Sequence, residues 1–472
     1  MDAPSASAKQ QTVRDIVSQV INRVLPETAL RHHVMLDGNT LVVDGKDYDL
    51  NKFKSILVVG GGKAGRTTAL ELSSILGDRI AAGYLNVYQD QANEPISDKI
   101  KLYAADHPTP NEEGMKGARR MIESLRKADK STLVIALISG GGSALMATPV
   151  EGISLEDYKN IGNLLLTVPA TIDEINSVRK HIDPLKGGGM RKLAANAGAF
   201  ITLVLSDVPV TKTGVVDDPS VIASGPTVGD DSTFETAKKV LTEHKIWDRV
   251  PEAVRKYIEE NLGKDENETL RKDSPLLTQD KSQYVMIANN DQAMEAAKET
   301  AEKHGYSVHL IGWNTGLTED KIKDEVSVEI KKIQTVVTPH VAADDEITFA
   351  SFSTDGVDGH CDLAGAIADR NTLKLAKEKG IDYKQYLENF DSASFFEKLG
   401  LEIKTGPTGT NVADICVVLI TNPGDPKRRI AVIFGGEATV NIALPEGRKP
   451  GFGGRNTHLT LLAAEIVDKL NN

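Results

Sequence analysis

The feature that most constrains the fold is a buried strand followed by a glycine-rich loop and a helix. Residues 55–59 form an apolar run of strand length, residues 60–65 read Gly-Gly-Gly-Lys-Ala-Gly, and an amphipathic helix pattern begins near Arg66. Such a loop presents backbone N–H groups at a helix N-terminus, where a phosphate can approach without meeting a Cβ atom. Lys63 adds a mobile positive charge. This segment therefore predicts a site that handles an anion.

Short apolar runs alternate with helical patterns along most of the chain. The expected strands and helices fall at 82–88, 113–127, 133–138, 200–205, 284–288 and 293–304. This alternation predicts an α/β fold with a mostly parallel sheet covered on both faces. We expect two domains, because 472 residues are too many for one ordinary core. The polar stretch at 263–282 reads as the linker, which gives domains at 1–280 and 281–472.

Charge and cysteine content exclude several classes of protein. The formal net charge of −12 argues against nucleic acid as the main partner, since no broad basic field is present. The two cysteines, Cys361 and Cys416, lack metal-ligand spacing and fit a reducing compartment. No secretory signal is visible at the N-terminus, and the apolar runs are too short to cross a bilayer. We therefore expect a cytoplasmic protein without membrane partners.

A second glycine loop, Ser-Gly-Gly-Gly-Ser at 139–143, follows the strand expected at 133–138. Its amides can converge on one anion, and two such loops at strand ends of one sheet indicate a ligand crevice. Asp207 lies just beyond the next strand, where a carboxylate can accept a hydroxyl proton, hold a metal ion or simply cap the following turn. The candidate phosphate-binding residues are Gly61, Gly62, Gly65, Ser139, Gly140, Gly141, Gly142 and Ser143.

Two other interpretations of the first loop stay open. Gly60, Gly62 and Gly65 match G-x-G-x-x-G, which is typical of dinucleotide binding, although Asp90 is a poor candidate for the acidic residue expected about 20 positions on. Ala64 stands where a Walker A loop has Ser or Thr. The loop is also compatible with a turn that only packs a helix onto a strand.

The second half holds further candidate loops. Residues 354–359 place two carboxylates on a tight turn, as in magnesium sites but also in solvated turns. Residues 404–411 are rich in glycine and hydroxyls, and Gly435-Gly436-Glu437 ends a strand. Arg455 opens the last helix, where a cation opposes the macrodipole, which favours a functional role.

Other ionic residues receive a plainer interpretation. His107, within His-Pro-Thr-Pro, reads as a turn residue. Arg179, Lys180 and His181 read as the basic end of a helix, where they complement the dipole. Lys186, before three glycines, stays ambiguous.

In this order, the motifs closely resemble those of the glycerate 2-kinase family, whose C-terminal part is the MOFRL domain. The resemblance covers the chain from about residue 56 to about residue 462. It implies a Rossmann-like N-terminal domain and an α/β MOFRL C-terminal domain. It also implies phosphorylation of D-glycerate at the 2-hydroxyl, with ATP as co-substrate and Mg²⁺ or another divalent metal. The expected partners are these small molecules, and a homodimer stays open.

The resemblance also implies roles for individual residues. The family's proposed catalytic lysine and aspartate match Lys63 and Asp207, and we expect Arg455 to act with them on the transferred phosphoryl group. Thr408 and Asn411 are expected at the nucleotide, and Asp355 and Glu437 at the metal.

The chain departs from the family at residues 456–458, where Asn-Thr-His replaces the usual Asn-Gln-Glu, and at 210–212, where Val-Thr-Lys follows Asp-Val-Pro. These departures bear on the choice of substrate or nucleotide. The alternatives are an NAD(P)-dependent hydroxypyruvate reductase and a nucleotide sensor without turnover.

Overall fold

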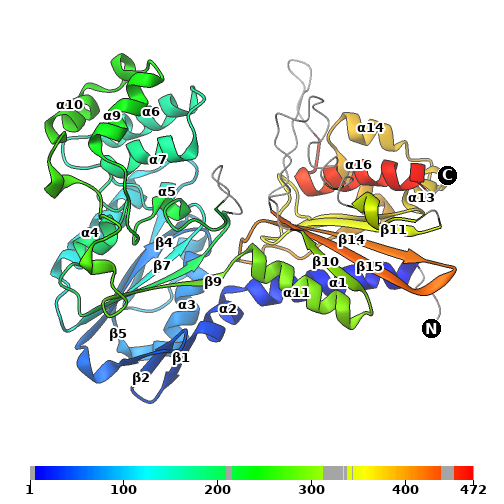
Figure 1. The fold of residues 1–472 in the computed structure, drawn as a ribbon, viewed down its shortest axis with the longest axis horizontal. Helices are drawn as coiled ribbons and strands as arrows, with labels where there is room; N and C mark the ends of the chain where they lie inside the picture. Colours follow the sequence, from blue (N-terminus) through cyan, green and yellow to red (C-terminus); the bar gives the residue numbers. More distant parts are fainter. Residues whose placement is uncertain are drawn as a thin grey trace. The chain divides into compact units, whose positions relative to one another are not determined.

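The computed structural model describes residues 6–208, 215–311, 333, 337–342, 344–436 and 451–470. The chain forms two compact units (Figure 1). The larger unit is Pro26–Ile287, and the smaller unit combines Met1–Leu25 with Ala288–Asn472. Each is described below by itself.

The larger unit is built on a six-stranded sheet in the order β6-β5-β4-β7-β8-β9. All pairings from β6 to β8 are parallel, as predicted. The order reverses between β4 and β7, which makes their carboxyl ends the topological switch point where open α/β sheets bind ligands. The strands are β4 (Ser55–Gly61), β5 (Ile80–Tyr88), β6 (Ile100–Ala105), β7 (Thr132–Ser139), β8 (Ala199–Leu205) and β9 (Ser282–Ala288).

Helices cover both faces of this sheet, so every residue of β7 is buried. Helix α4 (Glu112–Lys127) places Met121 and Leu125 on the face formed by Val59 and Val134. Helix α3 (Gly65–Leu76) leaves the first glycine loop, and the short α5 (Gly142–Leu145) leaves the second. Two further short helices, α2 (Pro26–His33) and α8 (Gly189–Leu193), complete this layer. A small antiparallel sheet precedes β4 and consists of β1 (Val34–Asp37), β2 (Thr40–Val43) and β3 (Lys46–Asp49).

A second, helical layer of the larger unit has a core of its own. Tyr158, Val178, Phe234 and Val254 meet in it. Its helices are α6 (Leu155–Leu166), α7 (Ile172–His181), α9 (Phe234–Glu243) and α10 (Glu252–Asn261). Figure 1 shows α5 and then α7 beyond the ends of β4 and β7. The helical layer therefore stands next to the switch point.

The predicted domain boundary differs from the observed one at both ends. The strand expected to open the second domain is β9, which completes the first sheet, and the Phe200 N–H donates to the carbonyl of Lys281 at 3.0 Å. Helix α1 (Ala6–Val24), expected in the N-terminal domain, belongs to the smaller unit. Its buried residues, such as Ile16 and Val20, cover helix α11 (Asn290–Lys303). Alternation of elements does not specify which sheet or layer an element joins.

The smaller unit contains a mixed six-stranded sheet in the order β10-β15-β14-β11-β12-β13. Within the described strands of this second sheet, β10 and β15 are parallel and the other pairs are antiparallel. The prediction of a mostly parallel sheet therefore holds for the larger unit and not for the smaller one. A tight hairpin joins β14 to β15, and strands joined in this way must run antiparallel. The strands are β10 (Ser307–Ile311), β11 (Glu346–Ser353), β12 (Gly365–Asp369), β13 (Glu402–Ile403), β14 (Asp414–Asn422) and β15 (Asp425–Gly436).

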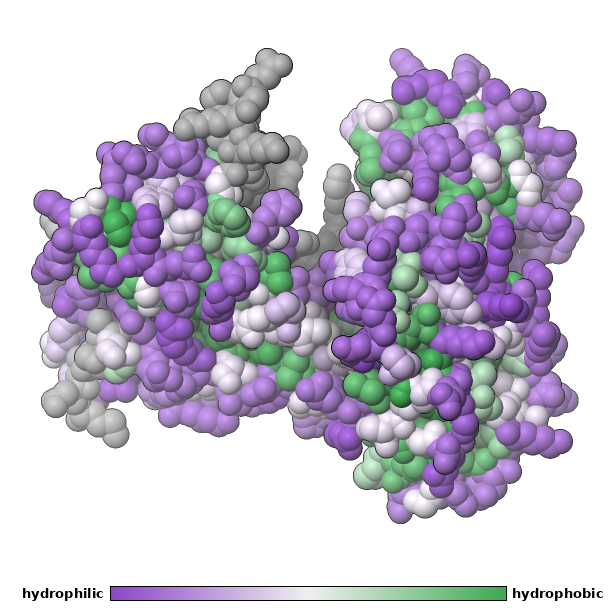
Figure 2. Space-filling view, turned by 180° about the vertical axis from the view of Figure 1, so that it is seen from behind, coloured by the Kyte–Doolittle hydropathy of each residue, from purple (hydrophilic) through white to green (hydrophobic). Residues whose placement is uncertain are grey.

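Helices lie on both faces of the second sheet. Leu459 and Ala463 of α16 (Arg455–Leu470) pack on Phe349 and Cys416 of the strands. Helices α13 (Thr372–Glu378), α14 (Tyr383–Glu388) and α15 (Ser392–Leu399) lie on the same side, and α1 and α11 on the other (Figure 1). Hydrophilic residues cover most of the face seen in Figure 2. Among the helices of the described residues, none combines the length and apolarity needed to cross a bilayer.

Candidate active site

The two glycine loops of the larger unit are bonded to each other at the switch point. The Lys63 N–H donates to the carbonyl of Gly140 at 2.8 Å, and the Ala64 N–H donates to Ser139 Oγ at 3.1 Å. Gly62 has φ 141°, and a Cβ there would lie 2.1 Å from Ser139 Oγ. Glycine is therefore required at this position for the loops to approach.

Lys63 and Asp207 lie together at this crossing. Lys63 Nζ stands 3.8 Å from Asp207 Oδ2, with side chains 30% and 20% exposed. The Asp207 carboxylate lies directly over Gly140, where a Cβ would come within 1.9 Å of Oδ2. The loops after β4, β7 and β8 thus bring together an ammonium group, a carboxylate and a glycine backbone in one partly exposed position.

His107 joins this group, although its sequence context indicated only a turn. Its Cδ2 and Lys63 Cγ each lie 3.3 Å from the point where a Cβ on Gly141 would stand. Burial and the Lys63 charge lower the pKa of the His107 imidazole, which favours its neutral form. Asn111 holds the loop by donating to Asp106 Oδ2 at 2.9 Å. His107 follows the end of β6, and its place after a strand of the same sheet was the one available indication.

Ser143 is tied to the helical layer. Its Oγ lies 2.9 Å from Ser224 Oγ, and the Ser224 hydroxyl donates to Asn176 Oδ1 of α7 at 3.0 Å. Ser224 ends the short helix η4 (Ile222–Ser224) in a left-handed conformation, with φ 62°. This three-residue chain connects the second glycine loop to α7, and spacing in the sequence did not indicate it.

The other glycines of the two loops serve close packing. A Cβ on Gly61 would lie 2.6 Å from the carbonyl of Asn86, and one on Gly142 would lie 2.8 Å from Ala223 Cβ. Gly65 is the first residue of α3. The structural interpretation of these glycines therefore holds, and their contact with phosphate stays a proposal.

Three basic side chains of this unit have buried carboxylate partners of their own. Lys180 pairs with Asp230 at 2.6 Å, and His181 pairs with Glu268 at 2.9 Å. Lys186 pairs with Asp183 at 2.7 Å. The helix dipole alone does not account for these residues, since each meets a specific carboxylate.

In the smaller unit, the three candidate motifs form one cluster of loops. A Cβ on Gly356 would lie 2.0 Å from the carbonyl of Gly406, and one on Gly454 would lie 2.3 Å from the backbone of Asp358. The Asp358 carboxylate accepts from the Asn456 N–H at 2.9 Å and from the Thr457 N–H at 2.7 Å. Asp358 therefore occupies the anion position at the N-terminus of α16.

Arg455 is held by a carboxylate on β14. Its Nε donates to Asp414 Oδ2 at 2.6 Å and its Nη2 to Asp414 Oδ1 at 3.1 Å, a bidentate pair. Asp414 is 2% exposed and Arg455 33%. Burial raises the pKa of Asp414 to about 6, against the opposing charge of Arg455.

The residues predicted to bind nucleotide and metal in this unit shape the loops. Thr408 Oγ1 donates to the carbonyl of Thr354 at 2.7 Å, and Asn411 Oδ1 accepts from the Ala413 N–H at 3.1 Å. Asp355 Oδ1 accepts from the Ser353 hydroxyl at 2.7 Å.

Glu437, the other predicted metal ligand, lies outside the described residues. Within the described ranges, no three side chains of metal-ligating type gather. A Mg²⁺ ion carried on nucleotide phosphates needs only one or two carboxylates, so a carboxylate such as Asp355 fits that type of binding.

The chain matches two family models and several curated proteins. Residues 12–259 match a domain of unknown function (DUF4147), and residues 328–414 match the MOFRL family. The chain is 34% identical over 444 residues to glycerate 2-kinase of Pyrococcus horikoshii, covering 86% of this chain and 96% of that protein. It is 32% identical to a putative hydroxypyruvate reductase of Agrobacterium vitis, covering 77% of this chain and 99% of that protein.

A solved structure also resembles this chain over most of its length. The crystal structure of glycerate kinase from Thermotoga maritima superposes with a TM-score of 0.69 at 28% identity, covering 88% of this chain and all of that one. The two-domain α/β expectation is thereby confirmed. The chain belongs to the glycerate 2-kinase family with a C-terminal MOFRL domain.

Proposed function

We propose that this protein is a glycerate 2-kinase, which transfers the γ-phosphoryl group of ATP to the 2-hydroxyl of D-glycerate. The observation that carries the proposal is the Lys63–Asp207 pair between two glycine loops at the switch point of a parallel sheet. The relatives named glycerate 2-kinase support it over most of the chain.

The pair suits phosphoryl transfer because it brings an ammonium and a carboxylate together in a partly exposed position. In the proposed reaction Asp207 accepts the 2-hydroxyl proton, and Lys63 neutralises charge on the phosphoryl oxygens. The substrate oxygen forms a bond to the γ-phosphorus, the bond from that phosphorus to the β–γ bridging oxygen breaks, and ADP leaves. Positioning and charge neutralisation supply most of the catalysis in such reactions.

Arg455 of the smaller unit is also proposed to act on phosphate. Asp414 fixes the direction of its guanidinium, a group that can neutralise charge on a phosphoryl group. Thr408 and Asn411 shape the loop proposed to lie at the nucleotide. Asp355 and Glu437 remain the proposed metal ligands, and a Mg²⁺ ion held there would supply positive charge that offsets the negative charge of the nucleotide phosphates.

The two cysteines of the chain bear on the cellular compartment. Cys361 and Cys416 are both buried, and we propose the reducing cytoplasm as the compartment.

The decisive experiment incubates the protein with D-glycerate, ATP and Mg²⁺, measures ADP, and identifies the product by NMR. We expect 2-phosphoglycerate, and 3-phosphoglycerate would contradict the assignment of the acceptor oxygen. Asp207→Asn should lose turnover while keeping the fold, because the amide cannot accept the hydroxyl proton.

Two alternatives are tested in the same experiment. NAD(P)H oxidation with hydroxypyruvate would indicate the reductase suggested by G-x-G-x-x-G and by the Agrobacterium vitis relative. Binding of ATP and glycerate without product in a single turnover would indicate a sensor.

A further inference from the structure

The last turn of helix α7 carries an arginine that forms no ion pair with a carboxylate of the described residues. This turn contains Arg179, Lys180 and His181. Lys180 and His181 each pair with a buried carboxylate, whereas Arg179 makes no ion pair or side-chain hydrogen bond with the described part of the chain. Arg179 is half-buried, so its guanidinium is only partly compensated by solvent.

Asp183, which acts on Tyr158 and Lys186 as Arg179 does, already accepts several hydrogen bonds. Asp183 Oδ2 accepts from Lys186 Nζ at 2.7 Å, from the Tyr158 hydroxyl at 3.1 Å and from the Thr148 N–H at 3.1 Å. Its Oδ1 accepts from the Leu185 N–H at 3.1 Å. Lys186 and Asp183 form one ion pair, and Arg179 adds a further positive charge that acts on Lys186.

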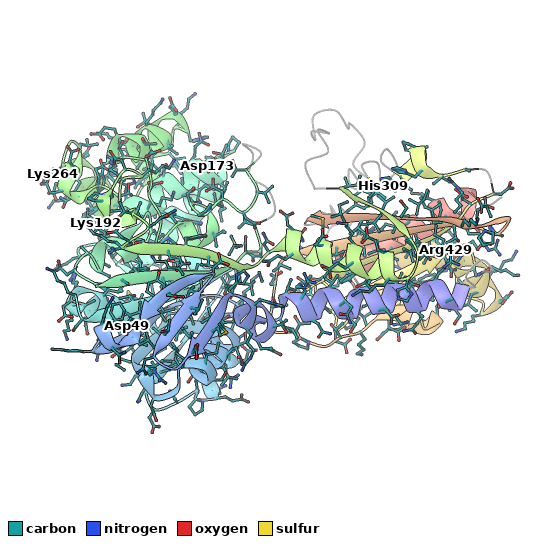
Figure 3. All side chains as sticks on the ribbon, turned by 60° about the horizontal axis from the view of Figure 1, so that its bottom comes forward. Asp49, Asp173, Lys192, Lys264, His309 and Arg429 are labelled. Carbon is teal, nitrogen blue, oxygen red and sulfur yellow. The ribbon has the colours of Figure 1, made fainter. Side chains whose placement is uncertain are left out.

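Arg179 also shares a face of α7 with Asn176, the residue that is linked to the second glycine loop. Asn176 is one helical turn before it, and residues three apart share a helix face. Asn176 accepts from Ser224, which bonds Ser143 of the second glycine loop. Asp173, labelled in Figure 3, marks the first turn of the same helix.

We propose that Arg179 binds the carboxylate of the acceptor substrate and so sets the specificity for a hydroxy acid. This inference rests on the proposed glycerate kinase activity. The planar guanidinium matches a carboxylate through two parallel hydrogen bonds. Lys63 and the glycine-loop amides lie at the strand ends and serve the phosphoryl group, which leaves the charge on α7 for the other anionic end of the substrate.

The test compares Arg179→Met with the wild-type enzyme. We expect the KM for D-glycerate to rise roughly 10- to 100-fold, which corresponds to the loss of hydrogen bonds to a charged group, while the KM for ATP stays unchanged. Arg179→Lys should show a smaller rise, because the charge stays and the planar fork is lost. Lys127→Met, which removes an exposed cation from the last turn of α4, is the matched control and should change neither KM.

A neutral analogue gives a second measurement. Wild-type enzyme should bind D-glycerate far better than D-glyceramide by calorimetry, and Arg179→Met should lose that preference. An unchanged KM for glycerate, or a rise confined to ATP, overturns the inference and returns Arg179 to a dipole-complementing role or assigns it to the nucleotide. Absence of ADP formation by the wild-type enzyme is a different outcome, since it overturns the proposed function itself.

Discussion

Each unit of this protein contains a charged pair that includes a predicted catalytic residue, and the two pairs differ in burial and in geometry. Lys63 and Asp207 are 3.8 Å apart and both are partly exposed. Arg455 and Asp414 form a bidentate pair with a contact of 2.6 Å, and the aspartate is buried. The first pair can exchange its partner for a ligand at little cost, whereas the second fixes a side chain in one direction.

This difference assigns different tasks to the two pairs. An exposed pair contributes little to stability, about 0–1 kcal/mol, so Lys63 and Asp207 should be sensitive in turnover and tolerant in folding. A buried pair is costly to break. Substitutions in the loops around α16 should therefore lower the free energy of unfolding first, and any loss of catalysis should follow from that.

The largest expected effect is on turnover in the larger unit. Lys63→Ala should lower kcat at least about 100-fold, because a preorganised charge at the phosphoryl group is lost, and leave the melting temperature nearly unchanged. Steady-state kinetics and calorimetry measure the two quantities. Lys54→Ala, an exposed lysine before the other end of β4, is the control. Near-normal turnover of Lys63→Ala would remove the basis for the catalytic pair.

Breaking the buried pair should have the opposite profile. Asp414→Asn should lower the free energy of unfolding by roughly 2 kcal/mol, because charge-assisted hydrogen bonds to Arg455 are lost. Denaturant titration measures this change. Asp362→Asn removes one partner of the exposed pair with Lys404 and should leave the free energy of unfolding nearly unchanged. Equal losses in both variants would contradict the contrast between locked and exposed pairs.

The smaller unit should also show an acid-dependent stability that comes from His458. This side chain is 8% exposed, stacks on Phe390, and burial lowers its pKa to about 4. The unfolded chain, with an ordinary histidine pKa near 6.5, binds the proton first as the pH falls. The stability that depends on neutral His458 is therefore fully present above pH 6.5 and is lost as the pH falls toward 4. The free energy of unfolding should fall by about 2 kcal/mol between pH 7 and pH 5 from this group.

His458→Phe should remove this dependence and keep the ring stacking. Unfolding measured between pH 7 and pH 4 tests it, with the exposed His360→Phe as the control in the same unit. An unaltered slope in His458→Phe would show that another group causes the acid sensitivity.

The smallest expected effect sharpens the description of the crevice. Ser143→Ala removes one neutral hydrogen bond to Ser224, so kcat/KM for glycerate should fall only about 2- to 10-fold. A fall of 100-fold would place the Ser143 hydroxyl among the catalytic groups.

Much of the larger unit was predictable because the carboxyl ends of parallel strands meet at one edge. That rule was enough to select Lys63 and Asp207, each directly after a strand. His107 was missed because its loop contains no glycine run, although it too follows a strand of the sheet. Asn176 and Ser224 were missed because their contact joins segments 48 residues apart.

The smaller unit was harder to predict because its motif residues bond mostly to one another. Loop composition alone cannot distinguish Thr408, bonded to a neighbouring carbonyl, from a nucleotide ligand. The carboxylate partner of Arg455 is 41 residues away in the sequence, and no local pattern links the two. Local sequence predicts strand ends well and long-range polar pairing poorly.

The assignment of α1 to the smaller unit affects the order in which the protein is made. Residues 26–287 can fold as soon as they emerge from the ribosome, since their sheet needs nothing synthesised later. Helix α1 emerges earlier still, but α11 and the second sheet do not yet exist, so its apolar face must wait uncovered until more than 260 residues have followed. The apolar face of α1 therefore stays exposed in the nascent chain during most of translation, which is when exposed apolar surface favours aggregation.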